Sequence, residues 1–395
     1  MRRRAMLRLT AVGVAGATAG CLSGREIGGE TTMGGGDRAY SVAEPFTGLS
    51  SPWGVTPLPD ESGLLVTEQG GQLLLGDPAS GALTEIAGGP TVDARQQGGL
   101  LDVTLHPAFA TTGLVYLTYT VGGADGTTTT AVGRGRLDRA AGRLDAFETI
   151  YEARPFVDST AHYGSRAVFD AAGYLFVSVG DRQFKNFGPG HVGQTLDDDL
   201  GCVLRLEPDG SIPTDNPFAS DPIASGAIYS LGHRNPQGLA IHPTTGAIWE
   251  SEYGEEDGDE INILQAGANY GWPVADNSCL YGTDEQIGQS HAERDDVVGP
   301  VFDWPCGTGG FPPSGTSFYD GEAFPDWQGD LLVAGTAGER LAHLAVDGQT
   351  VTERPSLLAD RQQRLRDVAV GPRSGAIYVA VDADPAPILK LTPGG

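Results

Sequence analysis

Polar side chains suited to chemistry are concentrated in a few short segments that flank predicted strands. These are residues 96–103, 162–166, 179–182, 232–238, 252–262, 269–273 and 364–368. A neutral imidazole such as that of His162 can take up a proton near pH 7, because its unperturbed pKa is about 6.5. Arginine pairs such as Arg364 and Arg366 can bind carboxylates in a bidentate manner. The acid-rich run 252–262 requires solvent or a hard cation such as calcium to offset its self-repulsion. The segments therefore indicate proton transfer, anion recognition and cation binding.

Each of these groups also has a purely structural interpretation. His162 is one of seven histidines and could be an ordinary surface-loop residue. Arg364 and Arg366 are two positions apart, so on any strand they share a face and could simply cover its surface. The run 252–262 could be a solvated acidic loop, as befits so acidic a chain.

A repeated pattern predicts the elements that position these segments. A turn with Pro or Asp, then a glycine, then a short apolar run rich in β-branched and aromatic residues recurs six times. The repeat glycines are separated by 50, 60, 73, 83 and 46 residues: Gly63, Gly113, Gly173, Gly246, Gly329 and Gly375. Such spacing fits blades of four strands with variable loops. An array of β-sandwiches would also share this turn chemistry, but the chain lacks long polar linkers.

We therefore predict an all-β fold, a six-bladed β-propeller formed by residues 39–395, with few long helices. In a propeller, ligand-binding groups lie on loops at one face and come from several blades. The two longest repeat intervals, of 73 and 83 residues, mark the expected functional region.

The composition limits the possible partners. The 395 residues include 51 acids and 25 bases, giving a formal charge of −26, which disfavours nucleic-acid binding. Only two of the bases are lysines, Lys185 and Lys390. This bias fits a high-salt habitat, where charge repulsion is screened, and it also fits an ordinary acidic exported protein.

The N-terminus has the pattern of an export signal. Residues 1–20 join a basic start to a short uncharged stretch, with a twin-arginine pair at Arg3 and Arg4 and a lipobox that ends at Cys21. An ordinary secretory peptide is the alternative. We expect a Gly-rich tether over 21–38 and a protein on the outer face of the cytoplasmic membrane. Contact with the membrane would be made only through lipid-modified Cys21.

Three further cysteines follow. Cys202 lies in an apolar run and is expected to be a buried strand thiol. Cys279 and Cys306 lie in loop-like segments, where they could either pair outside the cytoplasm or remain free.

Taken in order, the polar motifs resemble those of the soluble PQQ-dependent aldose sugar dehydrogenases, also called the glucose/sorbosone dehydrogenase family. The resemblance covers about residues 45 to 392 and rests on the ordered set rather than on any one motif. It implies a six-bladed propeller that holds pyrroloquinoline quinone (PQQ) and calcium. It also implies oxidation of the anomeric hydroxyl of an aldose to a lactone, with electrons leaving for an external acceptor.

The resemblance assigns roles to individual residues. His162 would be the general base, and Asp181 would orient it and stabilise its imidazolium form. Arg234 and Asn235 match the pair that contacts the quinone. Further cofactor positions are matched by Gln97, Arg364 and Arg366.

The same resemblance implies two calcium sites. The backbone carbonyls of Gly254 and Glu255 would hold the ion that also touches PQQ, and a second site would involve Asp259, Glu260 and Tyr270. The chain departs from the family pattern at three places. Glu255 replaces a usual proline, Ala161 replaces an acid, and no lysine occurs near 335–340, where Arg340 could substitute.

Two other functions compete with the dehydrogenase. A calcium-dependent lactonase-type hydrolase would need the metal but no quinone. A non-enzymatic sugar- or protein-binding propeller would bind its ligand without turnover. The joint presence of His162, Asp181, Arg234 and Asn235 favours the oxidoreductase. The sequence does not indicate which sugar is used, nor an oligomeric state.

Overall fold

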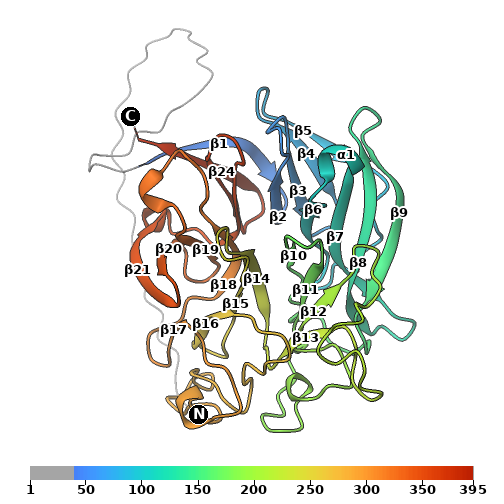
Figure 1. Cartoon of the computed structure of the whole chain (residues 1–395). Helices are drawn as coiled ribbons and strands as arrows, with labels where there is room; N and C mark the ends of the chain where they lie inside the picture. Colours follow the sequence, from blue (N-terminus) through green and yellow to red (C-terminus); the bar gives the residue numbers. More distant parts are fainter. Residues whose placement is uncertain (1–39, 395) are drawn as a thin grey trace, which may run out of the picture. The chain divides into compact units, whose positions relative to one another are not determined.

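The computed structural model describes residues 40–394, which form a ring of β-sheets (Figure 1). By contacts the chain separates into residues 1–37 and a unit from Arg38 to Gly395, and the latter is described below. Within residues 40–394 there are six four-stranded sheets whose neighbouring strands run antiparallel. The predicted all-β, six-bladed propeller is confirmed.

The first five blades take their strands in chain order, from the centre of the ring outward. The first two blades are β2 (Pro52–Pro57), β3 (Leu64–Glu68), β4 (Leu73–Asp77) and β5 (Ala82–Ile86), then β6 (Leu100–Leu105), β7 (Leu114–Gly122), β8 (Thr128–Asp138) and β9 (Arg143–Glu152). The third and fourth are β10 (Ala167–Phe169), β11 (Leu175–Val179), β12 (Cys202–Leu206) and β13 (Ile228–Leu231), then β14 (Pro236–Ile241), β15 (Ile248–Glu252), β16 (Asp259–Ile263) and β17 (Phe302–Trp304). The fifth is β18 (Pro313–Phe318), β19 (Leu331–Gly335), β20 (Leu341–Asp347) and β21 (Thr350–Leu357).

The sixth blade closes the ring with strands from both ends of the described chain. It contains β22 (Leu365–Val370), β23 (Ile377–Val381) and β24 (Ala386–Pro393), and its outermost strand is β1 (Tyr40–Leu49). Figure 1 shows β1, in blue, beside the red β24. The innermost strand β2 contacts both β6 and β22, so the first and last blades are neighbours.

The repeat glycines occupy one structural position. All six lie in the turn between the first and second strands of a blade. Five have left-handed φ angles between 63° and 94°, a region that favours glycine: Gly113, Gly173, Gly246, Gly329 and Gly375. At Gly63 the reason is steric, because a Cβ there would lie 2.7 Å from Leu75 Cδ1.

Aliphatic side chains pack between the faces of neighbouring blades. One such cluster joins Tyr116 and Val132 of the second blade to Val177 and Leu204 of the third. Each fully buried leucine or valine of this kind contributes about 1.5–3 kcal/mol to the free energy of folding. Cys202 lies in the same cluster as a buried free thiol, as expected.

Helices are short throughout residues 40–394. They are α1 (Phe109–Thr112) and four 3₁₀ turns: η1 (Val192–Gln194), η2 (His291–Glu293), η3 (Pro325–Trp327) and η4 (Ala359–Arg361). No helix in this part of the chain has the length and apolar character needed to cross a membrane. The export signal, the lipobox cysteine Cys21 and the 21–38 tether were predicted for residues that lie outside the described part.

Candidate active site

The predicted site residues lie on two kinds of loop. One kind runs from the outer strand of a blade to the inner strand of the next and carries Gln97, His162, Arg234 and Asn235. The other kind joins the second and third strands of a blade and carries Asp181, Gly254 and Glu255. Because the strands alternate in direction, both kinds of loop emerge at the same face of the ring. Segments far apart in the sequence therefore meet there.

His162 and Asp181 form a buried pair. His162 Nδ1 and Asp181 Oδ1 are 2.7 Å apart, and Trp272 Nε1 donates to Asp181 Oδ2 at 2.8 Å. The carboxylate thus favours the tautomer with the proton on Nδ1. His162 Nε2 makes no hydrogen bond to any of the residues 40–394 and remains available as a proton acceptor.

The surroundings keep the imidazole neutral. Burial lowers the pKa of His162, and the nearby positive charge of Arg234 lowers it further, while Asp181 opposes both effects. Burial alone would raise the pKa of Asp181, but its interaction with His162, which includes a hydrogen bond, and the charge of Arg234 bring it below its usual range. A neutral imidazole next to an ionised carboxylate is the arrangement of a general base.

Hydrogen bonds join the remaining predicted residues to this pair. Gln97 Oε1 accepts from the His162 backbone N–H at 2.8 Å, and Asn235 Oδ1 accepts from Gly164 N–H at 3.2 Å. The Asp181 backbone N–H donates to the carbonyl of Arg234 at 2.7 Å. The structure therefore brings Gln97, His162, Asp181, Arg234 and Asn235 into one connected group.

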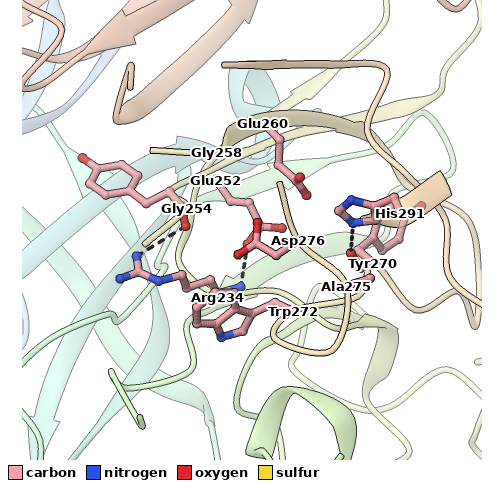
Figure 2. A pocket seen from close by; sticks show the side chains of 11 residues that line it. Arg234, Glu252, Gly254, Gly258, Glu260, Tyr270, Trp272, Ala275, Asp276 and His291 are labelled. Atoms are coloured by element: carbon pink, nitrogen blue, oxygen red, sulfur yellow. Dashed lines mark hydrogen bonds between the residues drawn. The ribbon is translucent and has the colours of Figure 1, made fainter. Parts of the chain in front are cut away.

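Arg234 is buried and only partly satisfied. Its Nη2 lies 2.7 Å from Glu255 Oε2. Its guanidinium lies over the ring of Trp272, 5.2 Å from the ring centroid; Figure 2 shows Arg234 beside Trp272. Arg234 Nε and Asn235 Nδ2 are buried atoms without a hydrogen-bond partner in the described part of the chain. Two unpaired donors beside a base would suit the oxygen atoms of a bound ligand or cofactor, since buried polar groups otherwise cost free energy.

Two further residues at this position escaped the sequence reasoning. Lys185 pairs with Glu255, so Glu255 joins two cations, Arg234 and Lys185. The sequence held only a weak sign of its importance, the rarity of lysine in this chain. Trp272 lay within a segment already identified as polar, 269–273, but had no assigned role.

Arg364 and Arg366 share a face, as both interpretations of the sequence allowed. Arg364 Nη2 and Arg366 Nη2 lie 2.9 Å and 2.8 Å from the same oxygen, Asp382 Oδ2. Arg366 Nη1 also donates to Gln237 Oε1 at 3.0 Å. Two guanidinium groups therefore share one carboxylate at the site face of the sixth blade.

A small cavity lies beside Arg234 and is lined by carboxylates. Its volume of about 10 Å³ is close to that of one water molecule or ion. Figure 2 shows Glu252, Glu260, Asp276 and His291 around it. Glu260 Oε2 is buried and has no hydrogen-bond partner within residues 40–394, and the same is true of Oε1 of the neighbouring Glu250.

Burial raises the pKa values of these carboxyl groups. It raises that of Asp276 to about 7, and it raises that of Glu260 well above its usual range, with Glu252 adding to the effect. Buried carboxylates that lack partners are stabilised by a cation, and oxygen ligands favour calcium or magnesium. The donors present fit such an ion.

The second predicted calcium site is brought together only in part. Glu260 and Tyr270 line the cavity, whereas Asp259 does not. The Asp259 carboxylate instead accepts from the backbone N–H groups of Gly254 at 3.1 Å and Phe311 at 2.6 Å. It therefore shapes the loop that carries Gly254 and Glu255. The sequence offered no sign of the lining residue Asp276.

A disulfide stabilises the loops beside this cavity. Cys279 and Cys306, whose pairing the sequence left open, are joined. The bond joins Cys279, in the long segment between β16 and β17 that also carries Asp276 and His291, to Cys306 in the β17–β18 loop.

Comparison with known proteins agrees with this architecture. The family model described as glucose/sorbosone dehydrogenase matches residues 49–390. Aldose sugar dehydrogenase YliI of Escherichia coli (strain K12) is 39% identical over 348 residues, which cover 87% of this chain and 91% of that protein.

Solved structures give the same picture. The apo crystal structure of the soluble aldose sugar dehydrogenase from Escherichia coli matches with a TM-score of 0.84 and 37% identity, over 90% of this chain and 100% of that one. The PQQ-bound aldose sugar dehydrogenase from Streptomyces coelicolor matches with a TM-score of 0.73 and 27% identity, over 89% and 98% of the two chains.

Fold and relatives together define the class of protein: a β-propeller enzyme, an oxidoreductase that acts on sugars. More specifically, the chain belongs to the glucose/sorbosone dehydrogenase family.

Proposed function

We propose that this protein uses PQQ and calcium to oxidise the anomeric hydroxyl of an aldose to a lactone and passes the electrons to an external acceptor. The observation that supports this most is the His162–Asp181 pair beside the buried, unpartnered donors Arg234 Nε and Asn235 Nδ2. The PQQ bound in the Streptomyces coelicolor relative supports the choice of cofactor.

In this proposal each site residue has a distinct role in the reaction. His162 Nε2 takes the proton of the sugar hydroxyl, and the carboxylate of Asp181 stabilises the resulting imidazolium. Arg234 and Asn235 donate to cofactor oxygen atoms and stabilise negative charge that develops there. PQQ, when bound, supplies a two-electron acceptor for the hydride from the sugar carbon.

Calcium would be held at two places in this proposal. The carbonyls of Gly254 and Glu255 lie on the loop beside Arg234 and would hold the cofactor-linked ion. Glu260 and the backbone of Tyr270 would hold the second ion, because the Tyr270 hydroxyl already donates to the Ile263 carbonyl at 2.7 Å. Glu252 and Asp276 supply further negative charge to the same cavity.

The direct test is an ultraviolet-visible titration of residues 39–395 with PQQ and Ca²⁺, followed by addition of aldoses. We expect stoichiometric binding and sugar-dependent reduction of the quinone. The His162→Ala variant should bind PQQ but reduce it at least about 100-fold more slowly, because the base is removed. His106→Ala, in the β6–β7 loop, is a matched control.

The alternatives give different outcomes. Hydrolysis of lactones with Ca²⁺ alone and no binding of PQQ would establish the hydrolase. Binding of sugar without turnover would establish the non-enzymatic propeller. Normal turnover by His162→Ala would exclude His162 as the base.

We also propose that the protein is exported and anchored by lipid at Cys21. The support is the arginine pair and the lipobox near the N-terminus. Expression of the full chain with Cys21→Ser in a native-type host should release the protein from the membrane fraction. Retention in that fraction would contradict the anchor.

A further inference from the structure

Arg182, next to the carboxylate that holds His162, is buried but has no carboxylate partner among residues 40–394. Its side chain donates four hydrogen bonds to neutral oxygen atoms. Nε donates to the Ala161 carbonyl at 2.9 Å, and Nη1 donates to the Thr128 carbonyl at 2.9 Å. Nη2 donates to Thr128 Oγ1 at 2.8 Å and to the Ser159 carbonyl at 2.5 Å. The residue is 1% exposed.

All these acceptors lie around one short segment. Ser159 and Ala161 lead directly into His162, and Thr128 belongs to β8 of the preceding blade. The ring of Tyr163, just after His162, lies under the guanidinium at 3.9 Å. Arg182 therefore contacts the chain on both sides of His162 and ties it to a rigid strand.

His162 needs such support because its backbone is unusual. Its φ angle is +48°, in the left-handed region that non-glycine residues avoid at a cost of about 1–3 kcal/mol. A conformation of this kind persists only where the surroundings enforce it. The β11–β12 loop also packs tightly against His162, because a Cβ at Gly180 would lie 2.3 Å from the His162 carbonyl oxygen.

The turn at residues 181–183 places two neighbouring side chains, those of Asp181 and Arg182, against the segment around His162. Arg182 and Gln183 both have left-handed φ angles, +59° and +64°. The chain therefore reverses sharply at this point. The Asp181 side chain reaches the His162 ring, and the next side chain, Arg182, reaches the His162 backbone.

We propose that Arg182 is a positioning residue that holds His162 in its left-handed conformation, so that the ring meets Asp181 through Nδ1 and leaves Nε2 facing the substrate. This inference rests on the proposed function only for its effect on turnover. The conformational part concerns the protein without sugar or cofactor.

The chemistry of the side chain argues for geometry rather than charge. A buried cation without a counter-ion is costly, and burial lowers the pKa of Arg182 to about 10. The planar fork of arginine reaches several acceptors at fixed angles, which the single nitrogen of lysine does not do. Arginine is the side chain that can join three acceptor residues at once.

The test compares Arg182→Lys, which keeps the charge, with Arg182→Met, which removes it. Arg205→Met is the matched control. Arg205 belongs to the same blade, stacks on Tyr174 at 3.7 Å and contacts Asp215 and Asn216, outside the candidate site. It reports the effect of losing a stacked arginine in general.

We expect both Arg182 variants to lower kcat by about 100-fold, as for a displaced catalytic group, with KM for the sugar changed by less than about threefold. Arg205→Met should leave kcat unchanged. If Arg182→Lys restores the wild-type kcat, charge rather than geometry is what matters, and the proposal is wrong.

A second measurement needs no turnover. The ¹⁵N signals of the His162 imidazole in the cofactor-free protein should show a single Nδ1–H tautomer, and in Arg182→Lys a mixture of tautomers. Unchanged His162 signals in a folded Arg182 variant would overturn the proposal. If instead these signals change as expected while His162→Ala retains turnover, the positioning role stands and the assignment of His162 as base fails.

Discussion

At the scale of single residues, the site depends on the bond between His162 and Asp181. Asp181 is almost fully buried and its two oxygens are both occupied, by His162 and by Trp272. The carboxylate therefore has a fixed orientation, and through it the tautomer of the base is fixed.

This arrangement predicts the effect of Asp181→Asn. An amide at this position cannot stabilise the imidazolium and favours the wrong tautomer, so kcat should fall by about 10²–10⁴-fold while PQQ binding is retained. Stopped-flow reduction of bound PQQ by an aldose measures the effect. Asp170→Asn, in the β10–β11 turn, serves as control, and equal rates in the two variants would contradict the role of Asp181.

Sequence reasoning found the bonded residues but not all of their neighbours. His162, Asp181, Arg234 and Asn235 stood in distinctive segments, so their types and order sufficed. Lys185 and Asp276 stood in loops without a recognisable pattern. Their positions depend on where long loops fold back, which the sequence does not show.

At the scale of elements, the start of β16 and the long segment after it carry buried acids, Asp259 and Asp276. Burial raises the pKa values of Asp259 and Asp276 to about 7, against an ordinary value of 3.8. Between these limits each of these two carboxyl groups binds more protons in the folded, metal-free protein than in the unfolded chain. The contribution of Asp259 and Asp276 to stability must therefore fall as the pH rises from about 4 to about 7.

Calcium should reverse the part of this loss that comes from Asp276, which lines the cavity. We expect Ca²⁺ to raise the thermal unfolding midpoint more at pH 8 than at pH 5, because the ion binds deprotonated carboxylates. Calorimetry with Ca²⁺ or with a chelator measures the difference.

Glu260→Gln should reduce the calcium effect, since it removes the unpartnered cavity carboxylate. Glu256→Gln is the matched control, because Glu256 is exposed and bonds Gly282 N–H at the surface of the same loop. An equal calcium response in both variants would place the ion elsewhere.

At the scale of the whole molecule, the site depends on closure of the ring. Its residues lie just before the inner strands of four of the six blades. Gln97 precedes β6, His162 precedes β10, Arg234 precedes β14 and Arg364 precedes β22. β1 pairs with β24 of the sixth blade, from Tyr40↔Pro393 to Leu49↔Ala386, and leads directly into β2 of the first blade. This pairing therefore holds the first and last blades together.

Removal of β1 should therefore open the ring. Deletion of residues 1–49 exposes the edge of β24, and we expect a lower unfolding temperature and self-association, since an unpaired edge strand invites pairing with another chain. Deletion of residues 1–38 leaves β1 intact and is the control. Size-exclusion chromatography and thermal unfolding compare the two, and identical behaviour would show that β1 is dispensable.

The sequence by itself determined the blade number and the chemical type of the site. The six repeat glycines mark a local turn, and local turn chemistry depends on neighbouring residues alone. The ordered polar segments likewise identified Gln97, His162, Asp181, Arg234 and Asn235 as one set.

Only the tertiary structure decided how these parts meet. It showed that Asp259 holds a loop and does not line the cavity, that Glu255 joins Arg234 to Lys185, and that Cys279 pairs with Cys306. It also showed that Arg182 donates to the carbonyl of Ala161, the residue before His162. These contacts join residues distant in sequence, and such contacts depend on how blades and long loops pack, which no local pattern of residues specifies.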